Sequence, residues 1–247
     1  MWTQNLLREE PGGGLPLHAY LLGQVDYEEG LRLQRLLVEE VRRRRDHAAL
    51  VVCEHPPYIS VGRHGSHAHI LINDEALEHR RWRVRWVNRG GGCFLHVPGQ
   101  LAISPILPLD RLDLGIQAFL DRLHQALVAV LDDFTVLATT RPGRAGVWVG
   151  GRMIAGVGVA VRDWVSWHGA VLNVCPDLQP FRHVRPGAGE EPMTSLSRER
   201  HGTPRVAHVR QSIVEHIRER FGLASPSIFF GHPEVRSDRL AEAVSPS

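Results

Sequence analysis

The 247-residue chain is 43% hydrophobic and carries a formal net charge of +2 at neutral pH, so it can bury the core of one ordinary α/β domain. This charge is too small to indicate a nucleic-acid or membrane-surface partner. The sequence holds no apolar run of about 18 residues, the length of a membrane span, and residues 1–22 lack the pattern of a signal peptide. Its three cysteines, Cys53, Cys93 and Cys175, do not form a disulfide framework. We therefore expect a cytoplasmic protein that binds no nucleic acid and no membrane.

All 29 basic residues are arginine, because the chain contains no lysine. Arginine is effectively never deprotonated, so it cannot serve as a general base in the way that lysine can. Any proton transfer must therefore use His, Asp, Glu, Tyr or Cys. Four of the arginines, residues 42–45, end a helix-like segment, where positive charge complements the helix dipole. We interpret this run as a solvated helix end.

The first half of the chain predicts two helices and several short strands. Residues 1–18 are polar and rich in Gly and Pro, which is typical of a loose N-terminal segment. Apolar residues at helical spacing predict helices over residues 25–45 and 115–134. Short apolar or alternating runs predict strands, and these cover residues 48–53, 58–62, 83–88 and 101–107.

The second half predicts an antiparallel meander followed by a helix. The predicted strands are residues 147–149, 153–161, 164–167 and 170–174. Gly156 and Gly158 leave one face of a strand nearly bare, which indicates that backbone or a ligand packs closely there. A last helix is predicted over residues 205–221, before a tail of residues 225–247. We predict one domain over residues 19–224, of the α/β (α+β) class, with a mixed and largely antiparallel sheet flanked by helices.

Residues 89–100, with the sequence RGGGCFLHVPGQ, are the most informative segment. Consecutive glycines directly after a strand-like run expose backbone that a ligand can approach closely, because Gly has no Cβ. Arg89 opens the segment and His96 lies near its end. This composition predicts a substrate-binding loop.

Four ordered blocks of the sequence resemble the octanoyl-[acyl carrier protein]:protein octanoyltransferases of the lipoate/biotin protein ligase superfamily. The loop just described is close to the family pattern RGG-x(3)-YHGPGQ. The other blocks are EHPP at 54–57 with VGR at 61–63, GVWV at 146–149 with IAGVG at 154–158, and HGAVLNV at 168–174 with DLQPF at 177–181. The resemblance implies the fold of a lipoate/biotin protein ligase catalytic domain.

The resemblance also implies an activity and a site. The activity is an acyltransferase step of lipoate biosynthesis and protein lipoylation, in which octanoyl passes from acyl carrier protein to a lysine of a lipoyl domain. The acceptor would be a lipoyl domain of a 2-oxoacid dehydrogenase or the glycine cleavage H protein. We expect a monomer with no cofactor and no metal. The implied substrate-binding residues are Arg89, Gly90, Gly91, Gly92, Cys93, Phe94, Leu95, His96, Gly156, Val157, Gly158, His168, Gly169, Ala170 and Val171.

Each part of this site has an expected role. The N–H groups of the three loop glycines are candidates to bind the acyl carbonyl oxygen, where negative charge develops during transfer. Gly156 and Gly158 are expected to leave an apolar slot for the acyl chain, whose burial contributes about 0.8 kcal/mol per CH₂. His96 and His168 are candidates to orient the thioester or the acceptor amine, and the alternative is that both are ordinary hydrogen-bonded histidines.

Two positions depart from the family, because Met153 stands where the resemblance implies a lysine and Gly187 where it implies the nucleophilic cysteine. Thiolate attack needs a sulfur and a group that takes its proton. One interpretation is a working transferase with a relocated nucleophile, for which Cys93 is the first candidate and Cys175 the second. An extended strand would, however, place Cys93 and His96 on opposite faces. The alternatives are a non-catalytic homologue that binds an acyl chain, acyl carrier protein or a lipoyl domain, and an adenylate-forming lipoate ligase, which ranks last because such ligases also use a lysine.

Overall fold

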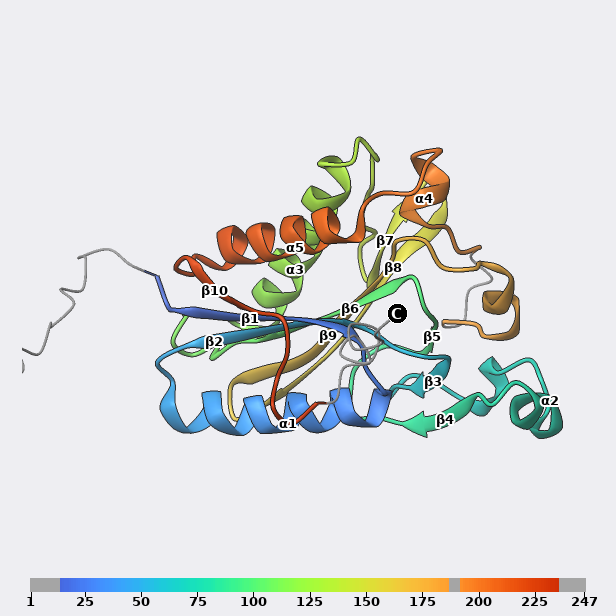
Figure 1. The fold of residues 1–247 in the computed structure, drawn as a ribbon, viewed down its shortest axis with the longest axis horizontal. Coiled ribbons are helices and arrows are strands. Elements are labelled where there is room, and N and C mark those ends of the chain that lie inside the picture. Colours follow the sequence, from blue (N-terminus) through green and yellow to red (C-terminus); the bar gives the residue numbers. More distant parts are fainter. Residues whose placement is uncertain (1–13, 187–191, 236–247) are drawn as a thin grey trace, which may run out of the picture.

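The structure is a computed structural model that describes residues 14–186 and 192–235. Its centre is a seven-stranded sheet with the strand order β10-β1-β2-β6-β9-β8-β7 (Figure 1). The strands are β1 (Leu17–Gln24), β2 (Ala48–Glu54), β6 (Gln100–Ile106), β7 (Gly146–Val149), β8 (Arg152–Arg162), β9 (Val165–Asn173) and β10 (Pro226–Phe229). The β10, β1 and β2 strands pair in parallel, and the other pairs are antiparallel. The predicted fold class is therefore confirmed.

Helices cover both faces of this sheet (Figure 1). The helix α1 (Tyr27–Arg44) lies on one face, and α3 (Ile116–Asp132) lies with α5 (Val206–Phe221) on the other. Asp26 caps the N-terminus of α1, and its carboxylate accepts a hydrogen bond from the Glu28 N–H. The apolar stripe of the helix, which includes Leu33 and Leu37, closes one core against the sheet, and Phe119 of α3 lies in the core on the opposite face. The apolar spacing in the sequence thus located all three helices.

A second, three-stranded sheet has the order β4-β3-β5 and is formed by residues between β2 and β6. Its strands are β3 (Tyr58–Val61), β4 (Arg83–Trp86) and β5 (Cys93–His96). Two short helices, η1 (His67–His69) and α2 (Asp74–His79), lie between β3 and β4 in the chain, and two more, η2 (Gln179–His183) and α4 (Leu196–Glu199), follow β9. The sequence did not predict β5, because the glycines before it suggested a continuous loop. All four residues of β5 are buried, so the second half of the glycine segment is fixed in place.

Three predicted boundaries differ from the structure. The β1 strand begins at Leu17, inside the predicted loose segment of residues 1–18, and β10 lies inside the predicted tail of residues 225–247. These two strands pair with each other, so parts of the chain that are far apart in sequence complete one edge of the sheet. The predicted break between residues 167 and 170 is absent, because β9 continues through His168 and Gly169 at positive φ.

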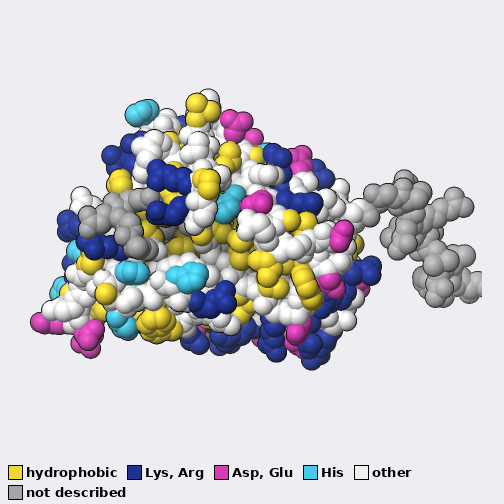
Figure 2. All heavy atoms as spheres, turned by 180° about the vertical axis from the view of Figure 1, so that it is seen from behind, with side chains coloured by type: hydrophobic (Ala, Val, Ile, Leu, Met, Phe, Trp, Pro, Cys, Tyr) yellow, Lys and Arg dark blue, Asp and Glu magenta, His cyan; other side chains and the backbone are white. Residues whose placement is uncertain are grey.

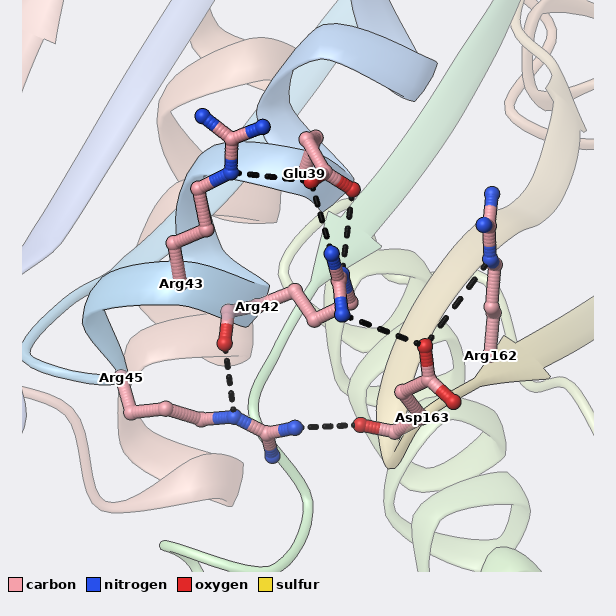
Figure 3. Close-up of polar contacts among 6 residues, drawn as sticks. All are labelled: Glu39, Arg42, Arg43, Arg45, Arg162 and Asp163. Atoms are coloured by element: carbon pink, nitrogen blue, oxygen red, sulfur yellow. Dashed lines mark hydrogen bonds and ion pairs between the residues drawn. The ribbon is translucent and has the colours of Figure 1, made fainter.

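Arginines at the end of α1 contact the turn between β8 and β9 (Figure 3). Arg42 pairs with Glu39 at 2.7 Å and with Asp163 of the turn at 3.6 Å. Arg45 caps the helix in the left-handed conformation and donates a hydrogen bond to the Asp163 carbonyl oxygen at 2.6 Å. Arg43 is mostly exposed, as predicted for a solvated helix end. Part of the arginine run is therefore solvated, and part of it attaches α1 to the sheet.

Within residues 14–186 and 192–235, no helix has both the length and the apolar content that crossing a membrane requires.

Candidate active site

The site lies where the glycine segment passes from the small sheet to the main sheet. The Gly90 N–H donates a hydrogen bond to the Val159 carbonyl oxygen of β8 at 2.8 Å. Directly beside this bond, Gly158 of β8 pairs with Gly169 of β9. The three segments that the resemblance assigned to the substrate therefore lie together. The same hydrogen bond occupies one N–H that was expected to bind the acyl carbonyl oxygen, and the role of the other two loop glycines stays a prediction.

Arg89 is a buried cation whose hydrogen bonds go to neutral groups. The residue is 2% exposed, and its guanidinium donates to the Ser60 carbonyl oxygen at 2.9 Å, the Ser60 Oγ at 2.8 Å and the Gly90 carbonyl oxygen at 2.9 Å. No ion pair between Arg89 and a carboxylate forms among the residues that the structure describes. Burial lowers the pKa of Arg89 to about 10, so the side chain keeps its charge at neutral pH. Within the described part of the site, the positive charge of Arg89 therefore has no acidic partner.

His96 is connected to Arg89 through Ser60. The His96 Nε2 lies 2.9 Å from the Ser60 Oγ. The same oxygen accepts a hydrogen bond from the Arg89 guanidinium, so one hydroxyl contacts both side chains. Burial, together with the nearby His55 and Arg89 side chains, lowers the pKa of His96 well below its usual value. The imidazole is therefore neutral at pH 7, and its orientation is fixed by the serine.

Two further aromatic side chains complete this polar cluster. The Tyr27 ring lies 4.9 Å from the His96 ring, measured between centroids, and the His55 Nδ1 lies 2.7 Å from the Val25 carbonyl oxygen. Both side chains line a cavity together with Arg89. Neither side chain was among the site residues predicted from the sequence, although His55 belongs to the EHPP block. The EHPP block could have identified His55 as a site residue. No local pattern indicates Tyr27, which lies at the site only because α1 begins beside the small sheet.

His168 lies at this cavity with a ring nitrogen that has no hydrogen-bond partner. Its Nε2 is buried and unpaired among the residues that the structure describes, and its backbone N–H donates to the Gln34 Oε1 at 3.0 Å. Burial, followed by the positive charge of Arg89, lowers the pKa of His168 to about 3. The next residue, Gly169, has a φ of 144°, and a Cβ added there would lie 2.1 Å from the Ile103 carbonyl oxygen. This position of β9 therefore requires glycine.

A second cavity, which is mainly apolar, is lined by Met153, the residue that stands where the resemblance implies a lysine. Met153 and Pro186 both line it, although they come from different parts of the sequence. The remaining walls are mostly apolar and include Phe181, Val184 and Met193. Gly187 lies outside the described residues. The position of the implied lysine thus faces an apolar space, and the residue before Gly187 borders the same space.

Parts of the glycine segment cover the bare face of β8. A Cβ added to Gly156 would lie 3.0 Å from carbon atoms of the Phe94 ring. A Cβ added to Gly158 would lie 2.7 Å from the Gly90 carbonyl oxygen and 2.9 Å from the Arg89 Nη1. The close packing that was predicted for this face is confirmed. The space directly over the two glycines, where an acyl slot was expected, is filled by protein atoms.

Cys93 and His96 face opposite sides of β5, as their odd spacing predicts. The Cys93 Sγ lies 3.5 Å from the Ser66 carbonyl oxygen and 4.0 Å from the His69 Nδ1. Burial raises the pKa of the Cys93 thiol, which therefore stays protonated at neutral pH. His69 was not predicted as a site residue, because it precedes Cys93 by 24 residues and the only local signal was the histidine-rich segment around it. Cys175 does not border the apolar cavity within the described part of the chain.

The face opposite to that of Figure 1 contains a hollow with hydrophobic side chains at its base and His and Arg side chains around it (Figure 2). Among residues 14–186 and 192–235, no three His, Cys, Asp or Glu side chains are grouped so that they could hold a metal ion. The described residues of the site therefore offer apolar walls, neutral histidines and one buried arginine.

The sequence profile of the lipoyl protein ligase A/B catalytic domain matches residues 26–218. The chain belongs to this family. An octanoyltransferase of Geotalea uraniireducens (strain Rf4) is 37% identical over 193 residues, which cover 78% of this chain and 87% of that protein. An octanoyltransferase of Geobacter sp. (strain M21) is 41% identical over 179 residues, which cover 72% of this chain and 84% of that protein. These relatives confirm the resemblance inferred from the four sequence blocks.

The solved structures support the same fold. A bi-partite lipoate protein ligase from Thermoplasma acidophilum, solved in a study of that archaeal lipoylation system and its E2 lipoyl domain, superposes with a TM-score of 0.67. The match covers 92% of both chains at 18% sequence identity. At this identity the likeness shows the fold alone.

Proposed function

We propose that this chain acts in lipoate biosynthesis by taking the octanoyl group of an acyl carrier protein and passing it to a lysine of a lipoyl domain. Octanoyltransferases at 37% and 41% identity support the reaction class. The observation that carries the proposal is the apolar cavity, where Met153, Pro186 and the β5 residues Cys93 and Leu95 border one space. The mostly apolar lining matches the chemistry of a saturated acyl chain, and Met153 within it stands where the family pattern implies the lysine. The monomeric state and the cytoplasmic location stay predictions.

Transfer through an enzyme thiol would use Cys93, because its side chain borders this cavity. In the first step, a bond forms between the Cys93 Sγ and the acyl carbon, and the carbon–sulfur bond of the carrier thioester breaks. The carrier thiol leaves with the proton that Cys93 releases, and the His69 Nδ1, 4.0 Å from the sulfur, is positioned to relay it. In the second step, the amine of the acceptor lysine attacks the acyl-cysteine, and the Cys93 thiol forms again.

A second candidate function is acyl binding without transfer. Met153 favours it, because a thioether cannot take a proton from a nucleophile. The burial of Cys93 favours it as well, since burial raises the pKa of the thiol and so disfavours the reactive thiolate. Adenylate formation by a ligase has weaker support, because the chain has no lysine and the lipoate ligase described above shares only the fold.

Intact-mass analysis distinguishes the two functions. The chain is incubated with octanoyl-acyl carrier protein and a lipoyl domain, and the mass of each protein is followed over time. Transfer predicts an octanoyl group on the lipoyl domain and a hydroxylamine-sensitive octanoyl adduct on the chain. Cys93→Ser and His69→Asn should remove both signals, and Cys175→Ser is the matched control that should retain them. If the octanoyl group stays on the carrier while the chain is thermally stabilised by it, binding without transfer is the function.

A further inference from the structure

Phe94 lies between two cavities of the described structure. Among the described residues, the only ones that line both the apolar cavity beside Met153 and the polar cavity beside Arg89 are Phe94 and Val171. Phe94 is 8% exposed and packs in the same core cluster as Val171. A buried aromatic ring therefore forms the partition.

The ring is held on two sides. On one side, its carbon atoms lie 3.0 Å from the position that a Cβ would take at Gly156. On the other side, the Arg89 guanidinium carbon lies 3.9 Å from the ring centroid, which is a favourable cation–π distance. Arg89 is in turn fixed by its hydrogen bonds to Ser60 and Gly90. The Phe94 ring is thus held in one orientation by its packing against Gly156 and Arg89.

Two glycines of β8 show how far apart the two cavities lie. Gly156 borders the apolar cavity and Gly158 borders the polar cavity. The two glycines lie on the same face of the strand, two residues or about 6.6 Å apart. Neither glycine has a side chain of its own, but the Phe94 ring covers Gly156, and the Gly90 carbonyl oxygen and the Arg89 Nη1 cover Gly158. The Phe94 ring is therefore the group that closes the apolar cavity over Gly156.

We propose that Phe94 is a specificity-determining residue that sets the maximum length of the acyl chain. The proposal rests on the acyl-binding function proposed above. An unbranched, saturated acyl thioester that enters beside Met153 extends until its end meets the ring. Carbon atoms beyond that point stay outside the cavity or must displace a buried side chain. When the ring is removed, the apolar cavity opens over Gly156 toward the polar cavity, beside Val171, which lines both.

The test is the binding of S-acyl pantetheine thioesters, from butanoyl to dodecanoyl, to the wild type, Phe94→Ala and Phe94→Leu. Thioesters are used because a free carboxylate would be attracted to Arg89 from the polar side. Inside the cavity each added CH₂ should tighten binding about fourfold, which corresponds to about 0.8 kcal/mol. This gain should end when the acyl chain reaches the ring, and the number of acyl carbons at which it ends is called the stopping length. In Phe94→Ala the stopping length should increase by at least two carbons, and in Phe94→Leu by less. Phe119→Ala removes a buried ring from the other core and should leave the stopping length unchanged.

The two Phe94 variants keep the test decisive. Leucine retains apolar packing at this position, so the stopping length can be measured with Phe94→Leu if Phe94→Ala does not fold. An unchanged stopping length in a folded Phe94 variant that still binds the thioesters would overturn the proposal and leave the acyl-binding function standing. If no thioester binds to any variant, the acyl-binding function fails and this proposal fails with it.

Discussion

The Arg89 guanidinium connects groups from both sides of the glycine segment. It contacts Ser60 in β3, the Gly90 carbonyl oxygen in the loop and the Phe94 ring in β5. A lysine would supply the charge but neither the fork of donors nor the flat face that lies against the ring. The hydroxyl of Ser60, which Arg89 holds in place, in turn fixes the orientation of the His96 ring through a hydrogen bond. The geometry of the polar cavity therefore depends on a small number of buried hydrogen bonds.

Replacing Ser60 by alanine tests this dependence. The change removes little volume, but it leaves one Arg89 N–H and the His96 Nε2 without their partner. An unsatisfied buried polar group costs about 1 to 3 kcal/mol, so the free energy of unfolding in urea should fall by at least that amount. Ser225→Ala, at an exposed position, is the control and should change the stability by less than about 0.5 kcal/mol. Equal stability of the two variants would contradict the proposed role of the Ser60 hydroxyl.

His168 should make the protein sensitive to acid. Its pKa is about 3 in the folded state and 6.5 in the unfolded state, so the unfolded chain binds the proton first as the pH falls. Stability is complete above pH 6.5 and decreases between pH 6.5 and 3, by roughly 2 kcal/mol at pH 5. His168→Asn, which tolerates the left-handed backbone, should lose less stability between pH 8 and pH 5 than the wild type does. Urea unfolding across this range measures the difference, and His208→Asn, at an exposed position, should keep the wild-type slope.

At the scale of elements, the sequence located most of the structure. Strong apolar periodicity predicted α1, α3 and α5, and apolar runs between Gly and Pro predicted β2, β3, β8 and most of β9. The missed strands, β1, β5 and β10, lie beside Gly- or Pro-rich segments. Their pairing partners are distant in sequence, so local patterns contain little information about them. The irregular backbone at His168 and Gly169 was interpreted as a break because glycine ordinarily weakens a strand.

The Gly169→Ala change tests how tightly β9 packs against β6. The new Cβ would lie 2.1 Å from the Ile103 carbonyl oxygen, and the φ of 144° is a conformation that L side chains rarely adopt. Strain and displacement together should lower the free energy of unfolding by about 3 kcal/mol or more. In Gly202→Ala, the added Cβ would meet nothing within 4 Å, so this variant should remain close to the wild type. Thermal or urea unfolding of the two variants measures the effect.

At the scale of the whole molecule, one sheet edge depends on the end of the chain that was predicted as a tail. The β10 strand pairs with β1, and Phe229 stacks on Tyr20 with 5.1 Å between ring centroids. A chain that ends at Ala224 should therefore expose the edge of β1, lower the melting temperature by several degrees and aggregate more readily. A chain that ends at Val235 retains β10 and is the matched control. Light scattering and thermal unfolding compare them, and identical behaviour of both chains would mean that β10 contributes little.

The site was predictable to the extent that its residues form motifs. The four sequence blocks placed Arg89, His96, Gly158 and His168 in one region, and the structure brings them together. The sequence did not reveal that Phe94 fills the space over Gly156, because side-chain direction depends on the pairing of β5. His69 and Tyr27 were missed for a similar reason, since their positions follow from how the small sheet packs.

The position of the small sheet within the chain has a consequence for folding. Cys53 of β2 pairs with Ala102 of β6, and residues 55–99 leave the main sheet between these two strands and return to the adjacent one. Pairing these strands closes a long loop, whereas β8 and β9 are joined by a tight turn at Asp163 and Trp164. Contacts between nearby residues form faster than contacts across long loops. We therefore expect a newly synthesised chain to form the glycine face of β8 before the segment that covers it. During that interval the uncovered face of β8 would be exposed, and chaperones or ligands could bind to it before the site is complete.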